Sequence, residues 1–217
     1  MRKILTSLSS ALFLIVLSVN ANAGGSIGIS GMVMDIDGSG SETVDNSNKN
    51  TGGTSSESVS VGSIFFETEK TNGWVLGMDL IPGSAEFVSS SKTQTNVTTA
   101  AGATESKTQK VSGDIENHFT IYLEKDIYEG VYLKVGGQSV DIISTENIGT
   151  GSQYPDTTLY GYTVGAGYRY DLDNIFIKLE YTYQDYDSIK LSATNTTNFV
   201  EGDIDAHTGK IAIGYKF

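Results

Sequence analysis

The chain contains no cysteine and only two prolines among its 217 residues. Without thiols it can form neither a disulfide framework nor a thiolate metal site, so its stability must come from elsewhere. After the first residues it also lacks any apolar run of the ~20 residues that a membrane-spanning helix needs. Acidic residues outnumber basic ones and give a formal net charge of −12, which argues against nucleic acid as a partner.

The start of the chain has the features of an export signal. Two basic residues precede an apolar run over 11–19, which is followed by Ala21-Asn22-Ala23. The run is too short to span the ~30 Å hydrocarbon core of a bilayer as a helix, and small residues suit a signal peptidase. We therefore expect a cleaved signal peptide over 1–23 and one mature domain over 24–217.

The mature part alternates apolar and polar residues in eight segments, most clearly from Val111 to Leu123. Such a period of two places one set of side chains in an apolar medium and the other in a polar one. A soluble sandwich would give the same pattern with the faces reversed. Lengths of about ten residues or more suit strands tilted across a bilayer. The sequence predicts an all-β fold, an eight-stranded transmembrane antiparallel up-and-down β-barrel, with strands near 26–36, 57–70, 74–87, 111–124, 130–142, 157–170, 175–187 and 204–217.

One parity of each strand predicts the lipid-facing wall. The expected rows are Val59, Val61 and Phe65; Trp74, Leu76, Met78 and Leu80; Val131, Leu133 and Val135; Tyr160, Tyr162, Val164, Ala166, Tyr168 and Tyr170; Ile175, Ile177, Leu179, Tyr181 and Tyr183; and Ile211, Ile213, Tyr215 and Phe217.

Connections between these strands alternate in length, which is typical of a barrel inserted in one direction. Short turns are expected at Thr71-Asn72-Gly73, around 126–130 and at 171–174. The long connections, rich in Ser, Thr, Asn and Gly, run over 37–56, 88–110, 143–156 and 188–203. We expect them to face the cell exterior without secondary structure of their own, and both ends of the barrel domain to lie in the periplasm.

An eight-stranded barrel is just wide enough for side chains to fill it. The inward parity supplies acids and bases that could pair across the lumen, because buried charges need partners. A packed polar network is the preferred interpretation, and a narrow ion path is the alternative. The residues of this predicted network are Asp79, Glu116, His118, Glu124, Lys134, Arg169, Lys178, Glu180 and Lys210.

The last strand ends with apolar or aromatic residues at alternating positions, Ile211, Ile213, Tyr215 and Phe217. This pattern resembles the terminal signature of bacterial outer-membrane barrels, and the whole mature chain resembles the small OmpA-like, OmpX-like and opacity-protein barrels. The resemblance implies a place in the bacterial outer membrane, contact with its lipid and lipopolysaccharide, and recognition of these four residues by the barrel-assembly machinery.

The sequence contains few motifs that indicate catalysis or metal binding. Some barrels of this size are lipid-modifying enzymes with a catalytic histidine, but neither His118 nor His207 stands in a pattern that identifies a triad. The stretch from Asp35 resembles the start of a calcium loop, yet Asn46 stands where a bidentate glutamate is needed. We therefore expect no catalytic residue, no metal site and no cofactor.

The function predicted from the sequence is a structural or surface-interaction role, adhesion or shielding, in which the long loops meet an extracellular ligand. The runner-up is a narrow ion or small-solute channel, and a lipid-modifying enzyme comes third. A monomer is expected.

Overall fold

The computed structural model describes residues 24–44, 48–49, 53–88, 92–98, 104–109, 112–144 and 152–217. The predicted signal peptide lies outside these residues, so its cleavage stays a prediction. Within the described ranges, no helix is both long and apolar enough to cross a membrane.

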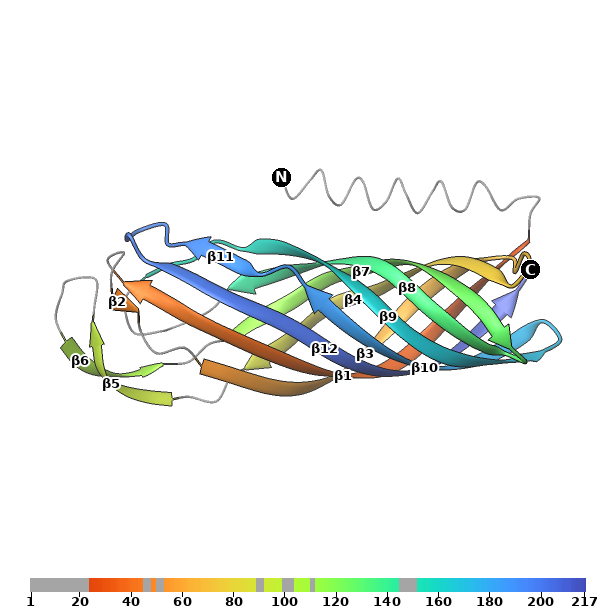
Figure 1. The fold of residues 1–217 in the computed structure, drawn as a ribbon, viewed down its shortest axis with the longest axis horizontal. Helices are drawn as coiled ribbons and strands as arrows, with labels where there is room; N and C mark the ends of the chain where they lie inside the picture. Colours follow the sequence, from red (N-terminus) through yellow and green to blue (C-terminus); the bar gives the residue numbers. More distant parts are fainter. Residues whose placement is uncertain are drawn as a thin grey trace.

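Eight long strands form one antiparallel sheet that closes on itself (Figure 1). Each strand pairs with the next long strand along the chain, and β1 closes the ring by pairing with β12 from Ser26↔Lys216 to Thr43↔Phe199. The predicted eight-stranded barrel is therefore confirmed. Its strands are β1 (Gly25–Val44), β3 (Gly53–Thr68), β4 (Trp74–Val88), β7 (Ser112–Tyr128), β8 (Val131–Ser144), β9 (Thr157–Leu172), β10 (Ile175–Tyr186) and β12 (Phe199–Lys216).

Strand pairing continues into segments predicted as irregular loops, so that prediction was wrong there. β1 extends to Val44, β3 begins at Gly53 and β12 begins at Phe199. The reason is that a ladder of backbone hydrogen bonds needs a partner strand but does not depend on apolar side chains. Polar segments can therefore extend a hairpin beyond the bilayer. Four short strands also lie in these segments: β2 (Asn48–Lys49), β5 (Lys92–Thr98), β6 (Thr104–Gln109) and β11 (Ile189–Ser192). The β5–β6 hairpin lies beyond one end of the barrel (Figure 1).

The three predicted short turns all lie at the opposite end, together with Gly25 and Phe217, whose backbones are hydrogen-bonded to each other. We call this the turn end, and the other the loop end. Asn72 and Gly73 both have positive φ, 53° and 75°, as a type I′ hairpin turn requires. Glu129 and Gly130 repeat the pattern with 38° and 89°. The turn residues thus set the register of these hairpins.

The outer wall of the barrel carries a band of exposed apolar side chains, such as Leu133, Val135 and Leu179. Tyrosines and other aromatic residues flank it: Trp74, Tyr128, Tyr168, Tyr170, Tyr215 and Phe217 toward the turn end, and Tyr160, Tyr162 and Tyr181 toward the loop end. An outward-facing row of acids, Asp37↔Asp205↔Asp185, continues in register to Tyr162 of the second group. An apolar band between aromatic girdles is what a bilayer selects on a barrel wall.

On β3 the predicted lipid-facing row was wrong. Phe65 is 1% exposed, and Val59 and Val61 line a cavity inside the barrel, whereas the opposite parity exposes Ile64 to 40%. Both parities of this strand carry apolar residues, so alternation alone does not identify the outer face. On β4, Met78 has outward parity but is only 6% exposed. Its cross-strand partners Phe66 and Ile121 flank it on that face.

Four inward aromatic rings each lie over a glycine of the neighbouring strand. The pairs are Phe65 with Gly28, Tyr122 with Gly77, Tyr132 with Gly167 and Phe176 with Gly214, and each pair is in direct register. A methyl group at any of these glycines would lie within 2.2–2.3 Å of the ring. The missing side chains are therefore what lets bulky rings fill so narrow a barrel.

We expect Gly214→Ala to destabilise the barrel by about 1–3 kcal/mol, because its new methyl would overlap the Phe176 ring. Gly209→Ala on the same strand is the control, since nothing lies within 4 Å of its added methyl and its effect should stay within about 0.5 kcal/mol. Urea unfolding of the two refolded variants in lipid vesicles measures the difference. Equal midpoints would contradict the ring-over-glycine packing.

Candidate functional site

The turn-end half of the lumen is filled by an ion-pair layer of four carboxylates and four cations. Its members are Glu67, Asp79, Glu124, Glu180, Lys134, Arg169, Lys178 and Lys210, and their side chains are at most 8% exposed. Equal numbers of acids and bases leave the layer without formal net charge. The ion pairs and hydrogen bonds of this layer form two chains of contacts.

The first chain is centred on Glu67, whose side chain is fully buried. Arg169 Nη1 on β9 lies 3.1 Å from Glu67 Oε2, and Lys178 Nζ on β10 lies 2.6 Å from Oε1. The Tyr122 hydroxyl donates to the same Oε1 at 3.0 Å, and Lys178 continues to Glu124 at 2.5 Å. Because β3 and β9 stand on opposite sides of the ring, this chain crosses the lumen.

The second chain is centred on Glu180. Its Oε1 accepts from Lys134 at 2.8 Å and lies 3.1 Å from Lys210 Nζ, while the Tyr132 hydroxyl donates to Oε2 at 3.0 Å. Lys210 continues to Asp79 on β4 at 2.9 Å. Each carboxylate in the layer is thus paired with a cation, which is the condition for keeping charges away from water.

Aromatic rings close the spaces around these cations. Lys134 Nζ lies 3.8 Å from the centre of the Tyr122 ring, and Arg169 Cζ lies 3.6 Å from that of Phe176. Phe176 in turn packs on Phe65 with ring centres 6.1 Å apart. Side chains therefore occupy the lumen at this level, which favours a plug over an ion path.

Seven of the nine residues in the predicted network lie in this layer. His118 is buried closer to the loop end. Glu116, two residues before it on β7, is half-buried and lies beyond a register shift, where it pairs with Asp141, whose neighbours Val140 and Ile142 face the lumen. Sequence reasoning missed Glu67, because the parity of β3 was reversed. Ser63 and Glu67 share the parity of Phe65 and could have signalled that this row faces inward.

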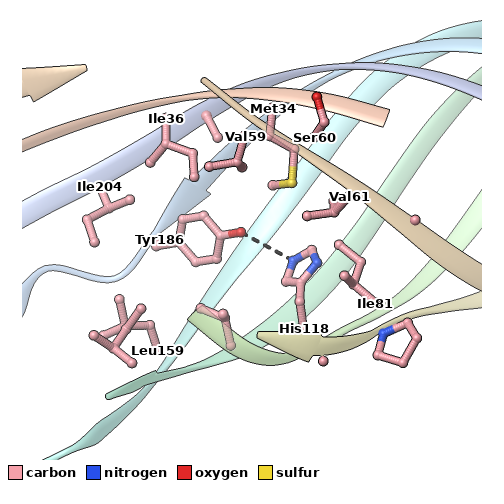
Figure 2. Close-up of a pocket in the computed structure, with 16 residues that line it drawn as sticks. Met34, Ile36, Val59, Ser60, Val61, Ile81, His118, Leu159, Tyr186 and Ile204 are labelled. Carbon is pink, nitrogen blue, oxygen red and sulfur yellow. Dashed lines mark hydrogen bonds between the residues drawn. The ribbon is translucent and has the colours of Figure 1, made fainter. Parts of the chain in front are cut away.

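Toward the loop end the lumen changes from charged to apolar. Here a chamber of about 240 Å³ opens, which the sequence did not predict (Figure 2). Figure 2 shows Met34, Ile36, Val59, Leu159 and Ile204 around it. Its further lining residues are Ser60, Val61, Gly62, Ile81, Pro82, Gly83, His118, Val140, Ile142, Tyr186 and Ala206.

At the chamber the barrel wall is incomplete between β3 and β4. Within the described range 53–88, these strands pair only from Ile64↔Leu80 to Glu67↔Gly77, although β3 pairs with β1 along its whole length. Pro82 has no backbone N–H to donate, and Gly83 has a φ of 97°. The ladder between β4 and β7 shifts register at the same place, between Ile81 and Ser84. The Pro-Gly dipeptide was the available sequence signal for this break.

The chamber reaches this gap. Its lining includes Val59 and Val61, which face inward, but also the exposed Ser60 and Gly62 of the opposite parity. On the neighbouring strand β1, Val33 pairs with Ser60 and is 49% exposed. The gap therefore begins within the apolar band of the outer wall.

Both histidines have tyrosine partners. His118 Nε2 lies 3.2 Å from the Tyr186 hydroxyl at the chamber wall (Figure 2), and His207 Nδ1 lies 2.8 Å from the Tyr181 hydroxyl on the outer face. The segment compared with a calcium loop continues β1 in extended form as far as Val44, and Asn46 lies outside the described residues. Among the described residues, no group of acidic, histidine or cysteine side chains is suited to a metal ion.

The four residues of the predicted assembly signal lie on the outer face of β12 or at its end, where they are 48–60% exposed. Their recognition by the assembly machinery stays a prediction. The Phe217 backbone pairs with Gly25 in both directions, at 2.9 and 3.1 Å, and so completes the seam between the first and last strands.

We expect Glu67→Gln to lower the free energy of unfolding by about 3–5 kcal/mol, since the change leaves Arg169 and Lys178 buried with too little negative charge. Glu201→Gln is a matched control, because Glu201 pairs with Lys190 at the exposed surface and should contribute less than about 1 kcal/mol. Urea titration of folded protein in vesicles reports both values. A Glu67 variant as stable as the control would show that the layer does not stabilise the barrel.

Comparisons with known proteins agree with this architecture. No protein-family model and no curated protein matches the sequence. Among solved structures, the outer membrane protein OprG of Pseudomonas aeruginosa superposes with a TM-score of 0.52 at 14% identity, covering 90% of this chain and 96% of OprG. AlkL, an outer membrane protein determined by solid-state NMR in DMPC lipid bilayers, gives 0.54 at 11% identity and covers 90% of each chain. The chain therefore has the fold of small bacterial outer-membrane β-barrels, which supports the expected place in the outer membrane.

Proposed function

We propose that the protein passes small apolar molecules from the cell exterior into the outer membrane, through the chamber and then sideways between β3 and β4. One observation carries the proposal: the chamber that lies inside the barrel is lined by both faces of β3 at the point where its pairing with β4 stops. A solute in the chamber is thus close to the lipid-facing side of the wall.

The composition of the two halves of the lumen favours apolar solutes over polar ones. Apolar side chains in the chamber favour an apolar solute by about 25 cal/mol per Å² of surface removed from water. Ions and polar solutes gain no such free energy, and the ion-pair layer blocks their way toward the turn end. The geometry therefore supports an apolar path better than the narrow ion channel considered from sequence.

The gap supplies the exit. An unpaired stretch of strand inside a bilayer leaves backbone groups without partners, at a cost that a barrel normally avoids by closure. Retention of such a stretch beside a cavity suits a functional opening. A solute that leaves here moves from an apolar chamber into hydrocarbon without crossing the ion-pair layer.

Filling the chamber tests the path. Val61→Trp places an indole in a space of about 240 Å³. We expect the initial uptake of radiolabelled octane by Gram-negative cells that carry this variant to fall about tenfold, toward the uptake of cells that lack the protein. Val135→Trp, at an outward position that is 53% exposed, should take up octane like the unmodified protein. Heat-modifiable gel migration verifies that both variants fold. Undiminished uptake by the Val61 variant would refute passage through the chamber.

Closing the gap tests the sideways exit. Because the chain has no cysteine, Ser60→Cys and Pro82→Cys provide the only thiols for a bismaleimide cross-link. We expect octane uptake to fall in the cross-linked double variant and to stay unchanged in either single variant treated with the same reagent. If the cross-linked protein still transports octane at the original rate, the solute leaves by another route.

A surface-interaction role is the second candidate. What supports it is the polar β5–β6 hairpin, which projects past the loop end of the barrel where an extracellular partner could reach it (Figure 1). Attachment assays with cells whose protein lacks 92–109 test this role.

Neither histidine stands in an arrangement that supports the enzyme considered third.

A further inference from the structure

We propose that a groove on the outer wall of the barrel receives the apolar solute when it leaves the chamber and holds it against the protein within the bilayer. The groove has a volume of about 890 Å³, which lies in the range of small-molecule binding sites. This inference rests on the proposed function, and it extends the path beyond the gap between β3 and β4.

The groove is continuous with the chamber. Ser60, Val61 and Gly62 of β3 line both of them. Val61 faces the lumen, whereas Ser60 and Gly62 are exposed on the outer face. These three residues lie just beyond Ile64↔Leu80, the pair at which the ladder between β3 and β4 stops. A solute that passes through the gap therefore emerges at one end of the groove.

Glycines on three neighbouring strands form the floor of the groove. Gly62 of β3 pairs with Gly31 of β1, and one row closer to the loop end Val33 pairs with Gly209 of β12. A methyl group added at Gly31 or Gly209 would meet nothing within 4 Å. Unlike the glycines beneath the inward rings, these two are not required by packing inside the barrel. A glycine within a strand is typical of a place where another molecule approaches the backbone closely.

Rows of larger side chains bound the floor on both sides. On the turn-end side, four isoleucines stand in one cross-strand row and are 37–61% exposed: Ile64, Ile29, Ile213 and Ile177. On the loop-end side, the next row contains Asp35, His207 and Tyr183. The groove is thus a trough that crosses the strands, from the gap beside β3 over β1 and β12 to Leu179 and Tyr181 on β10.

The composition of the groove suits an uncharged alkyl chain. Its outward aliphatic side chains, Val33, Leu179 and Ile211, are 49–58% exposed. Glu180 and Lys210 also border it, but their side chains point into the lumen, where they lie 3.1 Å apart and are at most 8% exposed. Lipid chains packed on a smooth wall must part to admit a solute, whereas a hollow in the wall provides space and contacts for it.

Charge distinguishes the solute from a membrane lipid as the occupant. Asp35 lies in the row next to the groove, and Asp37, Asp205 and Asp185 follow in the row beyond it. A lipid whose acyl chain lay in the groove would bring its head group close to these carboxylates. The phosphates of an anionic lipid are repelled there, and an uncharged solute is not. The occupant is therefore a neutral apolar molecule delivered through the chamber.

The location of octane can be measured directly by NMR, on the folded protein in nanodiscs of chain-deuterated phosphatidylglycerol that contain ordinary octane. Nuclear Overhauser effects (NOEs) from octane protons to protein methyl groups report which part of the wall octane contacts. A second sample with deuterated octane and ordinary lipid reports contacts of the acyl chains at the same methyl groups. The ratio of the two NOEs at each methyl group gives the local preference for octane over lipid.

We expect this ratio to be about fivefold higher at the groove than on the far wall, the preference that roughly ten additional carbon–carbon contacts provide. Val33, Leu179 and Ile211 report the groove. Leu133 and Val135 report the far wall, where they are 52% and 53% exposed. Equal ratios at the two walls, or a lower ratio in the groove because lipid chains fill it, would overturn the proposal.

Filling the groove from outside tests its part in transport. Gly31→Leu and Gly209→Leu each place a side chain in the trough, and we expect octane uptake by cells that carry either variant to fall severalfold. Gly137→Leu is the matched control, because this exposed glycine of β8 lies in neither cavity and an added methyl would lie 4.0 Å from the Gly161 carbonyl oxygen. Its uptake should equal that of the unmodified protein. Heat-modifiable migration verifies that all three variants fold.

The chamber methyl groups of Val140, Ile142 and Leu159 separate this inference from the proposed function. Their resonances should shift on addition of octane in the unmodified protein and in both groove variants. If they shift, and Val61→Trp lowers uptake while the groove variants transport octane like Gly137→Leu, passage through the chamber stands and the groove is refuted. If octane shifts none of them in the unmodified protein, the proposed function fails and the groove fails with it.

Discussion

Backbone hydrogen bonding in a medium without water is the constraint on which the rest of this structure depends. Inside a bilayer each unpaired N–H or C=O group costs several kcal/mol, and a sheet satisfies them all only by closing. The β1–β12 seam, from Ser26↔Lys216 to Thr43↔Phe199, achieves that closure. The stretch between β3 and β4 that remains unpaired is for this reason the most informative departure in the wall. Pro82, which has no N–H to donate, stands beside it.

Closure with eight strands fixes a narrow interior, and the two halves of the lumen fill it by different means. Near the turn end, rings seated on glycines and paired charges occupy the space, as Phe176 over Gly214 and Lys178 between Glu67 and Glu124 illustrate. Near the loop end, smaller aliphatic side chains such as Val59 and Val61 leave a chamber. The lumen thus changes from charged near the turn end to apolar near the loop end.

This change in polarity along the lumen connects the fold to the proposed function. A molecule that lowers its free energy by leaving water finds apolar surface at the loop end and a barrier of paired charges below it. The way that remains is sideways, past Gly62 and Pro82. Each step uses side chains that the strand register brings together from distant parts of the chain.

The sequence by itself determined the architecture, because strand number, turn positions and wall composition are local properties. Alternation along 175–183 identifies a wall strand, Asn72-Gly73 specifies a tight turn, and both are as predicted. What only the tertiary structure decided is which residues meet inside. On β3 both parities carry apolar residues, so the only signal in the sequence that the row of Phe65 faces the lumen was the polar pair Ser63 and Glu67 on the same parity. The chamber depends on the absence of bulk from several strands at one height, together with a break in pairing at Pro82. Neither is a property of one segment, since strand tilt and register between neighbours set which side chains share a level.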